Sequence, residues 1–170
     1  MQYSSKEYDA EKHDRFRALT VKQPYANDLV KFSHEDENGV RYAVKSIEVR
    51  SKKTTYRGDI LICSAANPVY PGMESGVTLG LVELYDVKPI SEITQEDWDN
   101  TRIPVEKRAK ITKGFGWLVR NPRRVIEMPI KGQLGIYSLV YTKGEIIEYP
   151  RMLKVDKKGW KQIKKKIQSK

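Results

Sequence analysis

A series of short β-type runs, separated by turn residues, is the feature that most constrains the fold. The longest run is GVTLGLVELYDVKPI at residues 76–90, and YRGDILICSA at 56–65 comes before it. Others occupy residues 15–22 and 41–50, and strand-like composition returns after Lys113. Val, Ile, Leu and aromatic residues favour strands, whereas Gly, Pro and Asn end them. The arrangement predicts an α+β chain built on a small mixed β-barrel or curled sheet with short flanking helices.

Two helical segments are expected between the strands. In QPYANDLVKF at residues 23–32, Tyr25, Leu29 and Phe32 recur at helical spacing, so this segment predicts a helix with one face toward the core. The second segment occupies residues 92–111, with helical turns on either side of a proline.

The basic charge is concentrated at the C-terminal end. The chain carries a formal net charge of +10, and residues 151–170 hold nine Lys or Arg against one acid. We therefore expect a polar N-terminal arm at residues 1–15, a domain at 16–150 and a basic C-terminal helix at 151–170. Such a helix favours polyanions through counterion release, and a solvated helix face is the alternative interpretation.

Composition disfavours several classes of protein and site. No apolar run approaches the roughly 18–20 residues of a transmembrane helix, so no membrane association is expected. The single cysteine, Cys63, and the lack of an apolar leader indicate a cytoplasmic protein. His13 and His34 are the only histidines and no glycine-rich phosphate loop occurs, so we expect neither a metal site nor a cofactor.

The stretch KSIEVRS at residues 45–51 carries three charged side chains among apolar ones. In a regular strand Glu48 and Arg50 share one face, which predicts an ion pair between them. Lys45 lies on the opposite face with the apolar residues. It meets Glu48 only where a bulge or the start of the strand breaks the alternation.

Three segments, in the order LTVKQPYANDLV, VKSIEVRS and YRGDILICSA, resemble the ASCH domain family. Three later segments extend the resemblance to about residues 17–140, and these are GLVELYDV, GWLVRNPRRV and PIKGQLGIY. The resemblance implies the PUA-like β-barrel of that family. One departure is the insertion SHEDENGVRYA, an acidic turn with Asn38-Gly39 as a hairpin signal. A second is Val44, which stands where the family has glycine.

The resemblance also implies a partner, namely RNA or a modified nucleoside bound in a basic cleft, with DNA as a further candidate. Cations would contact phosphate, aromatic rings would stack on bases, and side-chain amides would read base edges. The candidate binding residues are Lys22, Gln23, Tyr25, Arg50, Arg57, Trp117, Asn121, Arg123 and Lys131.

Several of these candidates have an equally good structural interpretation. Tyr25 and Trp117 are of the type that fills a hydrophobic core. Asn121 suits a turn before proline, Gln23 suits the opening of a helix, and Arg57 suits a loop cap.

A hydrolase is the alternative function. Some small ASCH proteins are amidohydrolases that deacetylate N4-acetylcytidine-type nucleosides, and ribonuclease activity is associated with others. The resemblance implies a central catalytic role for Lys45, with Glu48 as the second catalytic candidate. In the amidohydrolases a threonine stands at the position of Glu48, and the distal glutamate of that pattern has three candidates here, Glu83, Glu92 and Glu96.

Elementary electrostatics favours binding over catalysis. A lysine acts as a base or nucleophile only when its pKa falls from about 10.4. A carboxylate beside Lys45 would stabilise the ammonium and oppose that fall. A third alternative is a protein-interaction module that uses the apolar stripe of Trp160, Ile163 and Ile167.

Overall fold

The computed structural model describes residues 1–150, so the predicted C-terminal helix and its apolar stripe lie outside the described residues. A seven-stranded sheet has the order β1-β9-β2-β6-β7-β8-β5, and a separate hairpin pairs β3 with β4. Within the large sheet β2 and β6 are parallel and all other neighbours are antiparallel. The strands are β1 (Gln2–Tyr3), β2 (His13–Val21), β3 (Phe32–Glu35), β4 (Arg41–Ala43), β5 (Ile47–Arg50), β6 (Gly58–Ser64), β7 (Thr78–Pro89), β8 (Phe115–Arg124) and β9 (Ile136–Thr142).

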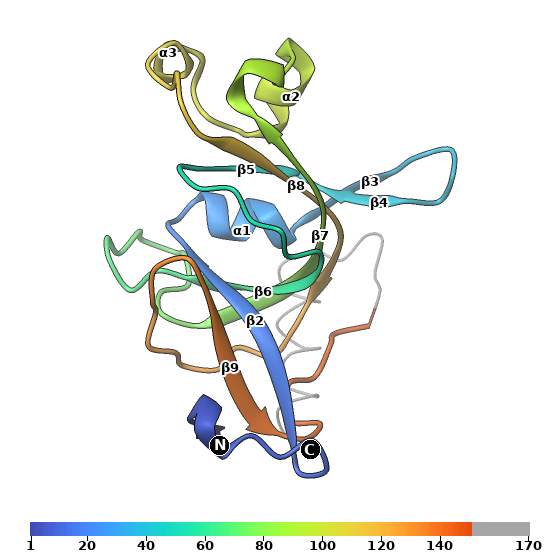
Figure 1. Ribbon diagram of the computed structural model, residues 1–170, viewed down its shortest axis with the longest axis vertical. Helices are drawn as coiled ribbons and strands as arrows, with labels where there is room; N and C mark the ends of the chain where they lie inside the picture. Colours follow the sequence, from blue (N-terminus) through green and yellow to red (C-terminus); the bar gives the residue numbers. More distant parts are fainter. Residues whose placement is uncertain (151–170) are drawn as a thin grey trace.

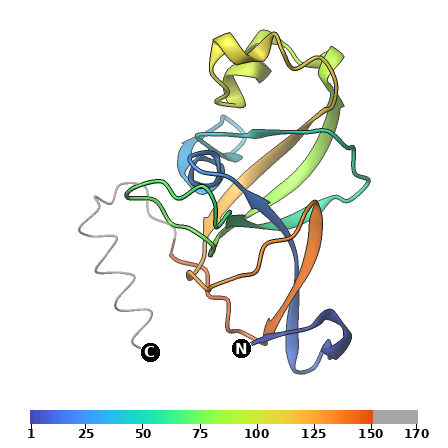
Figure 2. The same ribbon diagram turned by 90° about the vertical axis from the view of Figure 1, so that its left-hand side faces the viewer.

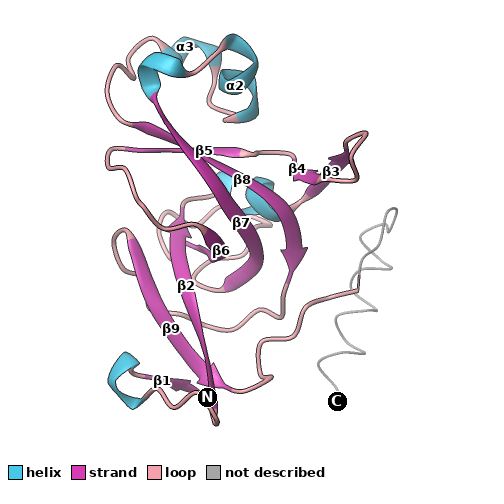
Figure 3. Cartoon of the chain, turned by 45° about the vertical axis from the view of Figure 1, so that its right-hand side comes forward, coloured by secondary structure: helices cyan, strands magenta, loops and turns pink. Residues whose placement is uncertain are grey.

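The helices are short and lie mostly at one end of the molecule. Figures 1 and 2 show α2 (Gln95–Asn100) and α3 (Val105–Arg108) together at the end opposite the chain's N-terminus. The β3–β4 hairpin projects from the body, as Figure 3 also shows. These elements confirm the predicted α+β class, including two helices on either side of Pro104 and a hairpin at Asn38-Gly39.

The hydrophobic core forms on both sides of the central strands. One cluster packs under α1 (Tyr25–Val30) and includes Leu29, Val82 and Trp117. The other includes Leu61, Cys63, Tyr137 and Tyr141. At Gly80 the helix comes so close that an added Cβ would lie 2.9 Å from Val30 Cγ1, so this strand position requires glycine.

The sheet does not close into a barrel, and that part of the prediction was wrong. Its edge strands are β1 and β5, which do not pair with each other. Instead, Arg50 on β5 reaches across to β2 and donates from Nη2 to the carbonyl oxygen of Thr20 at 3.1 Å. The β9 partner of β2 ends opposite Leu19, so this carbonyl lies beyond that ladder. The Arg50 side chain and a pocket thus lie between β5 and β2, which have no backbone ladder between them.

The predicted strand at 41–50 is broken after Ala43. The three linking residues send their backbone N–H groups elsewhere: Val44 to Lys31 O, Lys45 to Asp28 O and Ser46 to Asn100 O. Because these acceptors belong to α1 and α2 and their flanks, the linker follows the helices instead of a neighbouring strand.

Two other predicted boundaries differ. The first helix ends at Val30, because Lys31 is extended with φ −84° and ψ 115°, and Phe32 begins β3 instead of continuing the helix face. Near the C-terminal side, the run GEIIEYP forms only an isolated bridge between Glu148 and Val125. Among residues 1–150, no helix has both the length and the apolar composition needed to cross a membrane.

Candidate functional site

A pocket of about 430 Å³ lies between the end of β2, the start of α1 and β5. Its walls combine apolar side chains with three cations and one carboxylate. Its lining residues are Thr20, Val21, Lys22, Tyr25, Lys45, Glu48, Val49, Arg50, Ala65, Ile103, Gln133, Leu134 and Gly135. Residues of the motif KSIEVRS and residues at the end of β2 therefore line the same pocket.

Three charged residues of the motif form one ionic group, here called the pocket cluster (Lys45, Glu48 and Arg50). Glu48 lies between the two cations, with Oε1 3.3 Å from Lys45 Nζ and Oε2 2.8 Å from Arg50 Nη2. The predicted Glu48–Arg50 pair is therefore confirmed. Lys45 joins it because it lies in the linker before β5, where the strand alternation has not yet begun. With one carboxylate between two cations, the cluster retains one unbalanced positive charge.

Lys45 is almost completely buried, with 1% of its surface exposed. Its Nζ donates to Ile47 O at 2.8 Å and to Thr101 O at 2.6 Å, and it lies 5.0 Å from the centre of the Tyr25 ring. Together with Glu48 these contacts supply three acceptors, and only an ammonium has three N–H groups to donate to them. Burial lowers the pKa of Lys45, because the ammonium loses its water, and the Glu48 carboxylate counteracts part of that lowering.

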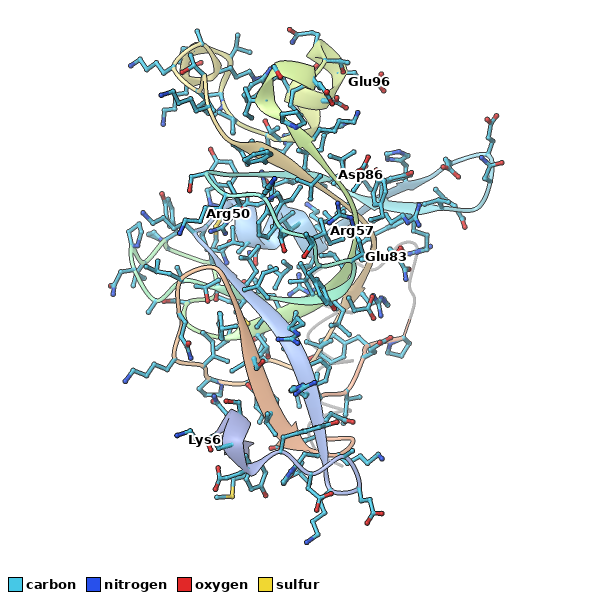
Figure 4. The ribbon with its side chains drawn as sticks, in the orientation of Figure 1. Lys6, Arg50, Arg57, Glu83, Asp86 and Glu96 are labelled. Atoms are coloured by element: carbon cyan, nitrogen blue, oxygen red, sulfur yellow. The ribbon has the colours of Figure 1, made fainter. Side chains whose placement is uncertain are left out.

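Arg50 has donors to spare. Its Nη2 donates to Thr20 O and contacts Glu48, whereas its Nε is buried and has no hydrogen-bond partner among residues 1–150. The desolvation of an unsatisfied donor costs free energy, and the rest of the Arg50 side chain is less buried, with 27% of its surface exposed. In Figure 4 Arg50 lies beside α1, apart from Arg57 and Glu83.

Five of the residues predicted for the site come together in the pocket, namely Lys22, Tyr25, Lys45, Glu48 and Arg50. Lys131 does not line it, but the loop that begins at Lys131 continues into the pocket wall at Gln133. The structural arrangement of these residues is thus defined, and their roles remain predictions.

Two residues predicted as ligand contacts, Gln23 and Trp117, are buried and bond to other parts of the protein. Gln23 is 3% exposed, and its amide donates to Asn27 Oδ1 and Glu74 O and accepts from Asn27 N. Trp117 is 4% exposed, lies in the core under α1, and donates from Nε1 to Lys52 O. Neither side chain lines the pocket.

Three more predicted contacts do not line the pocket: Asn121 and Arg123 lie on β8, and Arg57 directly precedes β6. Arg123 belongs to an outer cluster (Asp59, Arg123 and Glu148), in which it binds both carboxylate oxygens of Asp59 at 2.6 and 3.0 Å. Asn121 has φ 54°, at a bulge in the β7–β8 ladder, and Arg57 caps its own loop by donating to Thr54 O and Tyr56 O.

Several lining residues were not predicted to belong to the site. Ile103, Gln133 and Leu134 come from loops far along the chain, and the acceptor Thr101 O lies 56 residues after Lys45. Thr20 and Val21 belong to a strand that was predicted, but their position at the pocket follows from where β9 stops pairing. Among residues 1–150 no group of three His, Cys, Asp or Glu side chains is arranged to hold a metal ion.

A family model for the ASCH domain matches residues 38–133, more than half of the chain. The chain belongs to the ASCH domain family. The family is part of the PUA-like superfamily, and membership suggests an RNA-binding or related function. The match contains the whole pocket cluster, whereas Lys22 and Tyr25 precede it. No curated protein matches the chain.

Proposed function

We propose that the pocket binds one nucleotide of RNA or a modified nucleoside. The observation that carries the proposal is the pocket cluster itself, a carboxylate fixed between two cations in the wall of a pocket of about 430 Å³. Pockets of about 300–1,000 Å³ accept small ligands and are typically apolar with a few oriented polar groups. This pocket has that composition.

The phosphate and the base of a nucleotide both have complementary groups in the pocket. Lys22 is exposed at the wall and Arg50 is a partly exposed lining residue, so these cations suit a phosphate or a base carbonyl. The Glu48 oxygens each contact one cation, and a carboxylate has about four acceptor sites, so it can also accept from an exocyclic amino group. We therefore expect bases with an amino group to bind more tightly than uracil.

Binding fits Lys45 better than hydrolysis does. All three of its ammonium protons face acceptors, so no lone pair is available for attack or proton abstraction. As a fixed charge, Lys45 instead orients Glu48 and holds Thr101 O against the pocket wall.

Calorimetric titration with cytidine and cytidine 5′-monophosphate tests the proposal on the full chain. Lys22→Gln should weaken binding of the monophosphate about tenfold, equivalent to about 1.4 kcal/mol, because it removes a cation from the wall. Lys12→Gln is the matched control, since it removes the same charge from an exposed position outside the pocket. If no nucleoside, nucleotide, RNA or DNA binds to the protein, the proposal is refuted.

A lysine-centred hydrolase is the second candidate. The observation that favours it is the burial of Lys45 in the pocket wall, which lowers the pKa of this lysine although Glu48 opposes the change. Incubation with N4-acetylcytidine, followed by chromatography for cytidine, tests it. Lys45→Arg keeps the charge but cannot supply a neutral amine, so turnover by the wild type that this variant abolishes would establish the hydrolase. Cleavage of RNA in a parallel incubation would indicate the ribonuclease instead.

A further inference from the structure

The loop at residues 131–135, just before β9, forms one side of the pocket mouth. All five residues are exposed, and Gln133, Leu134 and Gly135 line the pocket. The loop is anchored at Gly132, where an added Cβ would lie 3.1 Å from Thr20 Oγ1. It is therefore held against the end of β2, while its tip carries side chains toward solvent.

Leu134 is the most exposed large apolar side chain described, with 100% of its surface accessible. Isolated exposed leucines are common on protein surfaces and need no explanation by themselves. This one differs in its setting, because it stands on the rim of the pocket and shares its loop with a lysine and a glutamine. The exposed Lys22, another lining residue of the same pocket, adds a second cation.

An exposed apolar group accompanied by two cations suits the alternation of base and phosphate along a nucleic-acid strand. A mononucleotide inside the pocket would leave the outward surface of Leu134 uncovered, whereas the next nucleotide of a chain would lie at the rim. Burial of apolar surface and contact with a base face both favour such a position.

We propose that the loop at residues 131–135 binds the nucleotide next to the one in the pocket, so that the ligand is a single-stranded oligonucleotide. Leu134 packs on the face of the adjacent base, and Lys131 pairs with the phosphate that links the two nucleotides. This inference rests on the proposed function of the pocket.

The test compares cytidine 5′-monophosphate with the dinucleotide CpC and with oligo(C), by titration of the wild type, Leu134→Ala and Ile147→Ala. Leu134 touches no core residue, so its truncation leaves the fold intact. Ile147 is 40% exposed and lies outside the pocket, which makes it the matched apolar control. All three proteins retain residues 151–170, so any contribution of that basic segment is common to them.

The expected result is tighter binding of CpC and oligo(C) than of the monophosphate by the wild type. Leu134→Ala should weaken oligo(C) and CpC binding about tenfold, leave the monophosphate unchanged, and differ from Ile147→Ala in this respect. If the wild type binds nucleotides and Leu134→Ala binds each ligand as tightly as the wild type does, the loop assignment is overturned and the pocket proposal stands. If the wild type binds none of them, both are overturned.

Discussion

The pocket cluster and the outer cluster have opposite balances of charge. In the pocket one carboxylate lies between two cations, whereas on β6 and β8 the single Arg123 lies between two carboxylates. Each side-chain nitrogen of Arg123 has a protein acceptor, whereas the Nε of Arg50 has no hydrogen-bond partner among residues 1–150. The two arginines thus differ in the charge and the donors that their protein partners leave unused, and under the proposed function only Arg50 is expected to contact a ligand.

The largest expected difference concerns stability. Glu48→Gln removes the carboxylate that contacts the buried Lys45, and breaking a buried pair costs about 3–5 kcal/mol because it leaves an uncompensated charge. Asp59→Asn in the outer cluster should cost no more than about 1 kcal/mol, since the Asp59 side chain is 52% exposed. Urea unfolding of the two variants measures both changes, and equal losses would break the comparison.

A smaller change in stability is expected from Cys63, a buried titratable group that has no charged partner in the described part of the chain. Burial raises the pKa of Cys63 from its ordinary value of 9.0 to about 12. Between these values the unfolded chain loses the thiol proton and the folded chain keeps it. This contribution to stability is therefore present below pH 9 and is lost as pH rises toward 12.

Replacement of the thiol isolates its contribution from that of the lysine. The lowered pKa of Lys45 acts in the opposite direction, so only the difference between wild type and Cys63→Ala is informative. That difference should diminish with pH by up to about 1.4 kcal/mol per pH unit above pH 9 in urea unfolding. A difference that stays constant from pH 8 to 11 would contradict the buried, neutral thiol.

The smallest effect compares two residues with left-handed backbone, one at each site. Arg102 follows α2 with φ 63°, between the lysine acceptor Thr101 and the pocket residue Ile103, and Asn121 lies at the outer bulge with φ 54°. Arg102→Gly should stabilise the protein by about 0.5–1 kcal/mol, because glycine adopts this conformation without a Cβ clash. Asn121→Gly should change little, since asparagine tolerates it. Thermal unfolding measures both, and a destabilised Arg102→Gly would assign that side chain another role.

Strand alternation and helical spacing in the sequence predict those parts of the site that depend on residues close together in the chain. The Glu48–Arg50 pair follows from strand alternation, and the helix that presents Tyr25 follows from apolar spacing. The position of Lys45 does not, because it depends on backbone bonds to Asp28 and to residues near α2.

The same limit explains the aromatic and barrel predictions. Tyr25 and Trp117 are equally plausible stacking residues in the sequence, and only the packing under α1 separates a pocket wall from a core residue. The prediction of a closed barrel was wrong because β5 and β2 are not paired by a backbone ladder. The Arg50 side chain bonds to Thr20 O instead, and the pocket lies between the two strands.

Backbone amide chemical-shift mapping with cytidine 5′-monophosphate tests the central claim most directly, because it distinguishes the two regions in one titration. We expect the shifts to concentrate at residues 20–25, 45–50 and 133–135, around the pocket cluster. Shifts confined to residues 57–59 and 121–124, around the outer cluster, would contradict it.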